Sequence, residues 1–399
     1  MTEAIADFSR RARTERAWWV AAGLVVFGLL YPFLVDTLQS LPLIGDFVPT
    51  TGSMVVMLIL TMMALGLNVV VGYAGLLDLG YVAFYAAGAY VAAWFASLQF
   101  DQVTLHIGSA VDGDLPGIHI SMWLVLIAAG VFTTIVGILI GLPTLRLRGD
   151  YLAIVTLGFG EIVPQFVRNA DSLGGFDLTN GTFGITPIDS LAFGGFVFRE
   201  QENKDDLYFW TAIGLILFTV FCCIRLRDSR LGRAWIAIRE DETAAAAMGV
   251  PLMRTKTWSY AIGAFFGGIA GAFFASYRAG AFPADFYFNI SIFLLSMVIL
   301  GGIGSIWGVF AGGMILAYLN IEGLSTIGSK IQDAGVEFDP TKYQFGIYGF
   351  IIVVMMLFRP TGLIPERRHK IELEEGVHDT PFYDVQTEGA LTDRDMSDD

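Results

Sequence analysis

The chain has 399 residues, of which 55% are hydrophobic and only 16% are charged. Soluble domains carry roughly 25% charged residues, so this composition excludes an ordinary soluble protein and predicts the all-α class, as a polytopic integral membrane helical bundle. The net charge of -14 argues against nucleic-acid binding, and the two adjacent cysteines, Cys222 and Cys223, offer neither a disulfide framework nor a metal site.

Charge and apolar length place the first three spans. Segment 1–16 is basic and precedes an apolar run over 17–35, and basic residues beside a first span keep that end in the cytoplasm. We interpret the run as a retained span because no small-residue cleavage pattern follows it. A second span over 53–71 returns inside at the glycine-rich segment Gly72–Tyr81, and a third over 79–98 leads out again.

Basic and polar connections alternate along the next spans. Arg146 and Arg148 follow the fourth span and a cluster of arginines follows the sixth, which places both connections inside. The long polar loop over 168–206 is expected outside. The three spans of this part are expected at 121–142, 151–167 and 207–224.

The segment Ser229–Gly249 is too polar to cross a bilayer, yet apolar runs lie on both sides of it. Its alanine run, Ala244–Ala247, favours a short cytoplasmic helix, which a serine caps and a glycine ends. Such a helix is suited to docking on another protein, and an interfacial helix without a partner fits the composition as well. Its apolar face consists of Leu231, Trp235 and Ile238. The charged residues available to water or a partner are Arg233, Arg239 and Glu240.

The seventh span, over 257–277, carries a repeated small residue on one face. Gly263, Gly267 and Gly271 recur every four residues, which lets a neighbouring backbone approach closely. We therefore expect this face to pack against another helix.

The last apolar stretches decide the number of spans. The run over 290–319 is interrupted at Gly301–Ser305, and the polar segment 320–343 is acidic, which suits the outside. The final span over 344–358 ends beside basic residues, which suit the inside. Both ends agree only if 290–319 crosses twice, so we expect about ten transmembrane helices with both termini cytoplasmic.

Two glycine-interrupted apolar segments, Gly72–Gly80 and Gly301–Ser305, occupy corresponding positions in the two halves. Such breaks are tolerated only where they line a cavity or are buried in protein, and ionisable residues at membrane depth are functional candidates. Asp78 can face a transport path or end a loop at the interface, and Asn68 and Glu161 can bond a solute or a neighbouring helix. The candidates for the path are Asn68, Gly72, Gly75, Asp78, Glu161, Gly301, Gly302 and Gly304.

Five motifs, in this order along the chain, carry a family resemblance. They are GYAGLLDLGYVAFYAAGAY at 72–90, LRLRGDYLAIVTLGFGEIVP at 145–164, SRLGRAWIAIREDETAAAAMG at 229–249, GGIGSIWG at 301–308 and FRPTGLIP at 358–365. Together they resemble the permease subunits of branched-chain amino-acid ABC importers, specifically the LivM-like family.

The resemblance implies a multi-pass pore in a prokaryotic plasma membrane. Such pores pair with a second homologous permease subunit, two cytoplasmic ABC ATPase subunits and an extracytoplasmic solute-binding protein. Segment 229–249 then corresponds to the coupling helix that sits in a groove on an ATPase. Its expected contacts are Arg233, Arg239, Glu240, Asp241, Glu242, Ala245, Met248 and Gly249.

The expected organisation follows from these spans and that resemblance. Residues 1–16 form a basic cytoplasmic segment, 17–365 the permease domain with its coupling loop at 225–256, and 366–399 an acidic, disordered cytoplasmic tail. The acidity fits a halophile or an ordinary solubilising extension.

Other chemistry finds no support. Gly323–Lys330 reads GLSTIGSK, which exchanges the Ser and Lys of a Walker A loop, so ATP hydrolysis is expected of partner chains and this chain is expected to be no enzyme and to need no cofactor. The four histidines lack metal-ligand spacing. The alternative functions are an ion-coupled secondary transporter and an ABC permease for urea or short amides.

Overall fold

The computed structural model describes residues 26, 28–41, 45–108, 115–147, 149–172, 177–333, 335 and 338–365. The basic segment 1–16, the start of the first expected span and the acidic tail 366–399 lie outside the described residues. The helices in chain order are one over 28–39, α2 (Thr51–Asn68), α3 (Val82–Phe95), α4 (Met122–Thr144), α5 (Asp150–Asn169), α6 (Lys204–Asp228), α7 (Arg230–Glu240), α8 (Glu242–Ala247), α9 (Leu252–Arg278), α10 (Phe288–Gly301), α11 (Ile306–Tyr318), α12 (Leu324–Asp333) and α13 (Gln344–Phe358).

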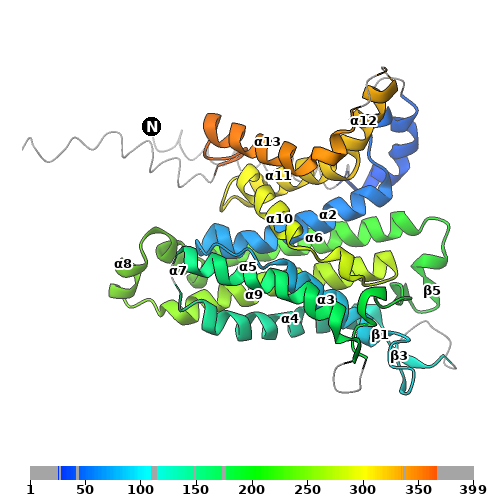
Figure 1. Cartoon of the computed structure of the whole chain (residues 1–399), viewed down its shortest axis with the longest axis horizontal. Helices are drawn as coiled ribbons and strands as arrows, with labels where there is room; N and C mark the ends of the chain where they lie inside the picture. The colour runs from blue at the N-terminus through cyan, green and yellow to red at the C-terminus, as the bar shows by residue number, and fades with distance from the viewer. Residues whose placement is uncertain are drawn as a thin grey trace, which may run out of the picture.

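Most of these helices run side by side along the long axis of the molecule (Figure 1). The two short helices α7 and α8 lie at one end, which we call the α7–α8 end. Short strands lie at the other, which we call the strand end: β1 (Ala96–Ser97), β2 (Thr104–Ile107) and β3 (Gly117–Ile120) form a sheet in the order β1-β3-β2, and β4 (Ala192–Phe193) pairs with β5 (Phe196–Val197).

Within the described residues, seven helical segments are long and apolar enough to cross a membrane, which makes this a multi-pass membrane protein. They are Gly45–Tyr73, Met122–Thr144, Lys204–Arg227, Leu252–Arg278, Pro283–Gly301, Ile306–Asp333 and Pro340–Phe358. The polytopic helical class is thus confirmed, whereas ten spans and cytoplasmic termini stay predictions.

The third expected span is shorter than predicted. Helix α3 begins only at Val82, because Asp78–Tyr81 does not continue as a helix, and α3 therefore has 14 residues rather than the length of a full crossing. Most of the Gly72–Tyr81 segment is buried inside the bundle, with Asp78 1% exposed, whereas Gly75 and Leu77 are exposed.

The glycine face of α9 packs as its spacing predicts. A Cβ atom on Gly271 would lie 2.0 Å from the backbone oxygen of Tyr85 in α3, and one on Gly263 would lie 2.6 Å from the side chain of Val70. The hydroxyl of Tyr81 donates to the Gly263 carbonyl at 2.8 Å. Backbone contact of this closeness requires glycine and fixes α9 against α3 and the end of α2.

The apolar run over 290–319 is two helices, as expected, and they fold back on each other. The break between α10 and α11 has two residues of positive φ, Gly302 (115°) and Gly304 (87°). A Cβ on Gly312 would lie 2.6 Å from the Gly301 Cα, and one on Gly308 2.3 Å from the Gly301 oxygen. Helices α10 and α11 therefore form a tight hairpin whose turn lies at Gly302–Ser305.

Candidate functional site

The segment 229–249 is helical but consists of two helices instead of one. Ser229 caps α7 by accepting from the Gly232 amide at 3.1 Å, as predicted. Asp241 has extended backbone (φ -150°, ψ 108°) and interrupts the helix, and its Oδ1 accepts from the Thr243 and Ala244 amides at 2.7 and 2.9 Å. The sequence pattern missed this break because a carboxylate that caps a new helix resembles one that faces solvent.

Helix α7 is attached to the bundle by Trp235. This side chain is 0% exposed, and its Nε1 donates to the Thr255 carbonyl at 2.8 Å, at the start of α9. Its ring stacks on Tyr73, at the end of the π-helical turn Val69–Tyr73 that continues α2, with 6.5 Å between centroids. Displacement of α7 therefore acts directly on two long helices of the bundle.

The expectation that Arg239 is available to water or a partner is wrong, because its side chain is bound within the chain. Its guanidinium turns inward and donates to the backbone carbonyl of Gly72. Its aliphatic stem packs on Gly75, where an added Cβ atom would lie 2.6 Å from the Arg239 Cγ. Gly75 itself has a φ of 68°. Helix α7 is thereby joined to the glycine-rich segment after α2.

Glu242 is also bound within the chain. Its carboxylate pairs with the Lys256 ammonium at 2.8 Å, and the Lys256 side chain is 4% exposed. Arg239, Glu242 and Lys256 line one groove of about 340 Å³ between α7 and the segment after α2, together with Glu240 and Gly75. Lys256 is a residue that sequence reasoning missed, because a lysine at the start of a span suggests only a topology signal.

The remaining coupling candidates divide between buried and exposed positions. Ala245 is buried against the chain itself, whereas Arg233, Glu240, Asp241, Met248 and Gly249 are exposed. Met248 is 86% exposed, an unusual position for a large apolar side chain, and Gly249 has a φ of 86° with nothing within 4 Å of a Cβ position. The outward surface at this end consists of a methionine flanked by charges.

The two glycine-interrupted segments meet, and Asn68 joins them. Its Oδ1 accepts from the Gly304 amide at 2.9 Å, in the turn of the α10–α11 hairpin, and Asn68 is 1% exposed. A Cβ on Gly72 would lie 2.0 Å from that Oδ1 and 2.7 Å from the Gly304 nitrogen. Asn68, Gly72, Gly75, Gly302 and Gly304 thus belong to one region of the protein.

Gly301 and Gly302 fix the hairpin turn to the chain after α13. The amides of Leu363 and Ile364 donate to the carbonyls of Leu300 and Gly301 at 3.0 and 3.1 Å. A Cβ on Gly362 would lie 2.4 Å from the Gly302 Cα. The motifs GGIGSIWG and FRPTGLIP are therefore in direct backbone contact.

Asp78 lies inside the bundle and not at a loop end near the surface. Its Oδ1 accepts from the Gly80 amide at 2.8 Å. Its Oδ2 has no hydrogen-bond partner among the described residues, although the Tyr260 hydroxyl is close to the carboxyl group without good hydrogen-bond geometry. Thr156 on α5 accepts from the Leu79 amide at 3.0 Å, so side chains of other helices satisfy this non-helical backbone.

Glu161 lies apart from this region, on the exposed face of α5. It makes no hydrogen bond or ion pair with any residue that the structure describes, and its side chain is exposed. The structure thus brings six of the eight path candidates together at the hairpin turn and the end of α2, places Asp78 a few residues further along that segment, and separates Glu161 from them.

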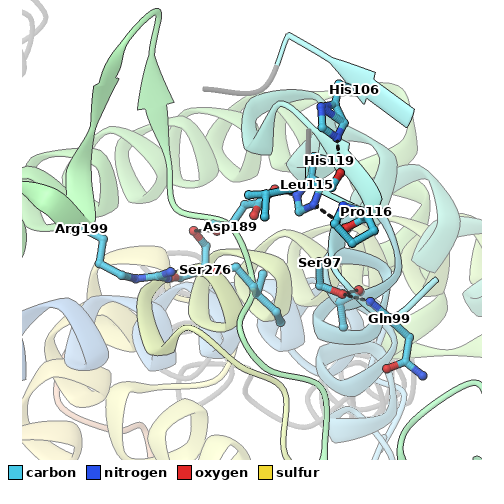
Figure 2. A network of polar contacts seen from close by, with 11 residues as sticks. Ser97, Gln99, His106, Leu115, Pro116, His119, Asp189, Arg199 and Ser276 are labelled. Carbon is cyan, nitrogen blue, oxygen red and sulfur yellow. Dashed lines mark hydrogen bonds and ion pairs between the residues drawn. The ribbon is translucent and has the colours of Figure 1, made fainter. Parts of the chain in front are cut away.

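A polar network at the strand end was not expected from the sequence (Figure 2). His119 on β3 is 2% exposed, and its Nδ1 lies 2.8 Å from Asp189 Oδ2. Arg199 donates to the carbonyls of Ile188 and Ser276 at 2.8 and 2.7 Å. Burial raises the pKa of Asp189, against the opposing effects of the His119 hydrogen bond and the Arg199 charge.

Known membrane permeases are similar to this chain over most of its length. The family described as "Branched-chain amino acid transport system / permease component" matches residues 50–356. The chain is 33% identical to the "High-affinity branched-chain amino acid transport system permease protein LivM" of Salmonella typhimurium and to that of Escherichia coli K12, over 88% of this chain and 76% of each relative. It is 26% identical to the permease protein LivH of Escherichia coli K12, over 47% of this chain and 58% of that protein. No solved structure matches the chain.

Proposed function

Because the chain belongs to the branched-chain amino acid transport permease family, we propose that it is the membrane subunit of an ABC importer that carries leucine, isoleucine and valine into the cell. It pairs with a second homologous permease, two cytoplasmic ATPase subunits and an extracytoplasmic solute-binding protein. The match to LivH, which is named as a permease of the same transport system, supports the second permease. The family match leaves an ion-coupled secondary transporter without support.

The observation that carries this proposal is the contact route from α7 to the hairpin turn. Arg239 on α7 bonds the Gly72 carbonyl, Gly72 lies against Gly304, and Asn68 bonds the Gly304 amide. Packed elements with such contacts move as units, so a displacement of α7 reaches the broken helices without any flexible step.

The exposed part of α7 and α8 is the surface that we assign to the ATPase. Met248 is exposed and apolar, so burying it in a groove is favourable, and Arg233, Glu240 and Asp241 provide charged contacts around it. Closure of the ATPase dimer around ATP would then push α7, and Trp235 and Arg239 would pass the push to α9 and α2. ATP hydrolysis belongs to the partner subunits.

The segment around Asn68, Gly72 and Asp78 is our candidate for the solute path. A helix that changes to a π-helical turn and then ends inside the bundle, and a buried carboxyl with one oxygen unpartnered among the described residues, are typical of places where a helix bundle handles polar solutes. Urea and short amides remain the competing substrates, because the binding protein makes much of the selection.

Uptake by the reconstituted complex tests the proposal. Proteoliposomes that contain both permeases and the ATPases, with binding protein outside and ATP inside, should accumulate labelled leucine. Excess isoleucine should block the signal and excess urea should not. Leucine uptake driven by an ion gradient without ATP, or competition by urea alone, would overturn it.

A further inference from the structure

Helix α5 carries polar residues on a face that no described residue covers. Ile154, Gly158, Glu161 and Gln165 follow each other at intervals of four, three and four residues, which aligns them along one side of the helix. Ile154 is 64% exposed, and Glu161 and Gln165 are exposed as well. We call these four residues the α5 stripe.

The two ends of α5 indicate the depth of the α5 stripe, although α5 is not one of the seven segments long and apolar enough to cross a membrane. The start of α5 borders the groove of Arg239 at the α7–α8 end, where Gly149 and Leu152 contribute to the lining. Its other end reaches the strand-end loops, where Thr179 donates to the Val167 carbonyl at 2.7 Å. Helix α5 therefore runs from one end of the bundle to the other, and its twenty residues cover about 30 Å, the thickness of the hydrocarbon. A helix placed in this way has Glu161 near the middle of that depth.

Lipid is a poor cover for this face. A carboxyl group near the bilayer centre is costly, and Glu161 has no partner in the described part of the chain that would offset that cost. The binding protein and the ATPases contact the complex outside the hydrocarbon and cannot reach it. Among the protein subunits of the proposed assembly, the second permease is the one that shares this depth.

The shape of the stripe also suits a helix from a partner subunit. Gly158 has nothing within 4 Å of a Cβ position, so a second backbone can approach α5 beside Glu161. Exposed apolar residues such as Ile162, at 61%, flank the stripe and would border the contact.

We infer that the α5 stripe is the surface on which the second permease packs, and that Glu161 accepts a hydrogen bond there from a donor on a partner helix. This rests on the proposed function only in requiring a second permease in the complex. Glu161 is then an interface residue at mid-membrane, separate from the Asn68 region within the chain.

Photo-crosslinking tests the surface. A benzophenone amino acid is placed at Gln165, at Ile154 and, as the control, at Leu139, which is 64% exposed on the apolar helix α4. In membranes that contain the whole complex, light should join this chain to the second permease from positions 165 and 154 but not from 139. Adducts from 139 alone, adducts between two copies of this chain, or no adduct would overturn the inference.

Copurification tests the hydrogen bond. Glu161→Leu should reduce recovery of the second permease on the tagged chain by about tenfold, Glu161→Gln should retain it, and Ile162→Leu is the matched control. Glu161→Leu should not reduce the amount of the chain in the membrane, because it removes a charge from the hydrocarbon. Equal copurification by all three variants would overturn this role.

Leucine uptake by the unmodified complex is measured in parallel. Crosslinks without ATP-driven uptake would refute the proposed function and keep the interface. Uptake without crosslinks would refute the interface and keep the function.

Discussion

The guanidinium of Arg239 donates a hydrogen bond to the backbone carbonyl of Gly72, 167 residues earlier in the chain. The contact joins the short helix at the α7–α8 end to the π-helical turn Val69–Tyr73, which continues α2 just before the backbone becomes non-helical. Through this contact the side chain of Arg239, on a helix at the end of the molecule, becomes part of the packing of the bundle.

Replacing Arg239 should uncouple ATP hydrolysis from import. In Arg239→Met the aliphatic stem still packs against Gly75 while the hydrogen bond to Gly72 is lost, so ATPase activity should persist and leucine uptake should fall by about tenfold, the effect of 1.4 kcal/mol. The control is Arg254→Met, because Arg254 is exposed at the start of α9 and has no part in the contact with Gly72. Equal uptake per ATP in both variants would show that the Arg239 contact transmits nothing.

The exposed residues Met248 and Gly249, directly after α8, should govern docking of the ATPase. Met248→Lys keeps the fold because Met248 is 86% exposed, but it places a charge where an apolar contact is expected, so less ATPase should copurify. Gly249→Val adds strain at a positive φ and bulk at the same surface, and it should abolish coupled uptake while the chain stays in the membrane. Gly249→Asn, which tolerates that φ, is the control, and unchanged uptake in Gly249→Val would argue against docking here.

The junction of Asn68, Gly72 and Gly304 should not accept a methyl group. In Gly72→Ala the new Cβ would lie 2.0 Å from Asn68 Oδ1, so we expect about 1–3 kcal/mol of destabilisation and loss of transport. Gly214→Ala on α6 is the control, since nothing lies within 4 Å of its Cβ position. Thermal unfolding in detergent compares the two, and a similar unfolding temperature would contradict the geometry.

Replacing both residues of the Lys256–Glu242 ion pair should destabilise the fold less than replacing Glu242 alone. Glu242→Gln leaves a buried ammonium without its anion, and we expect it to cost about 3 kcal/mol, at the lower end for buried pairs because Glu242 is partly exposed. The double variant Glu242→Gln, Lys256→Met should recover most of that stability. Glu240→Gln, at an exposed carboxylate of the same groove, is the control.

Stability should depend on pH through Asp189. Burial raises its pKa, so the folded state favours the neutral carboxyl group, and this stabilisation is present below the ordinary Asp pKa and is lost as pH rises through the raised value. Asn cannot ionise, so the unfolding temperature of Asp189→Asn relative to the unmodified protein should rise over that pH range. Asp171→Asn, at an exposed position, is the control, and parallel curves for all three proteins would contradict this assignment.

Most helix positions and the two glycine breaks could be predicted from the sequence because they depend on local patterns, whereas the start of α3 at Val82 and the break at Asp241 were missed. Ser229 as a cap, the glycine face of α9 and the turn at Gly302–Ser305 each follow from the residues at those places. The inward turn of Arg239 could not be predicted, because its position on α7 suits either direction and the acceptor is a carbonyl far away in sequence. The same holds for the pair of His119 and Asp189, which are 70 residues apart.

In the α10–α11 hairpin the backbones at Gly301, Gly308 and Gly312 are in direct contact. The chain after α13 packs against the turn of this hairpin at Gly362. There is no layer of side chains in this joint whose rotamers could rearrange, so the joint has no means to loosen gradually. In a transport cycle the hairpin would have to travel as one stiff lever, and the Asn68–Gly304 hydrogen bond at its tip would be the point about which it pivots or from which it detaches.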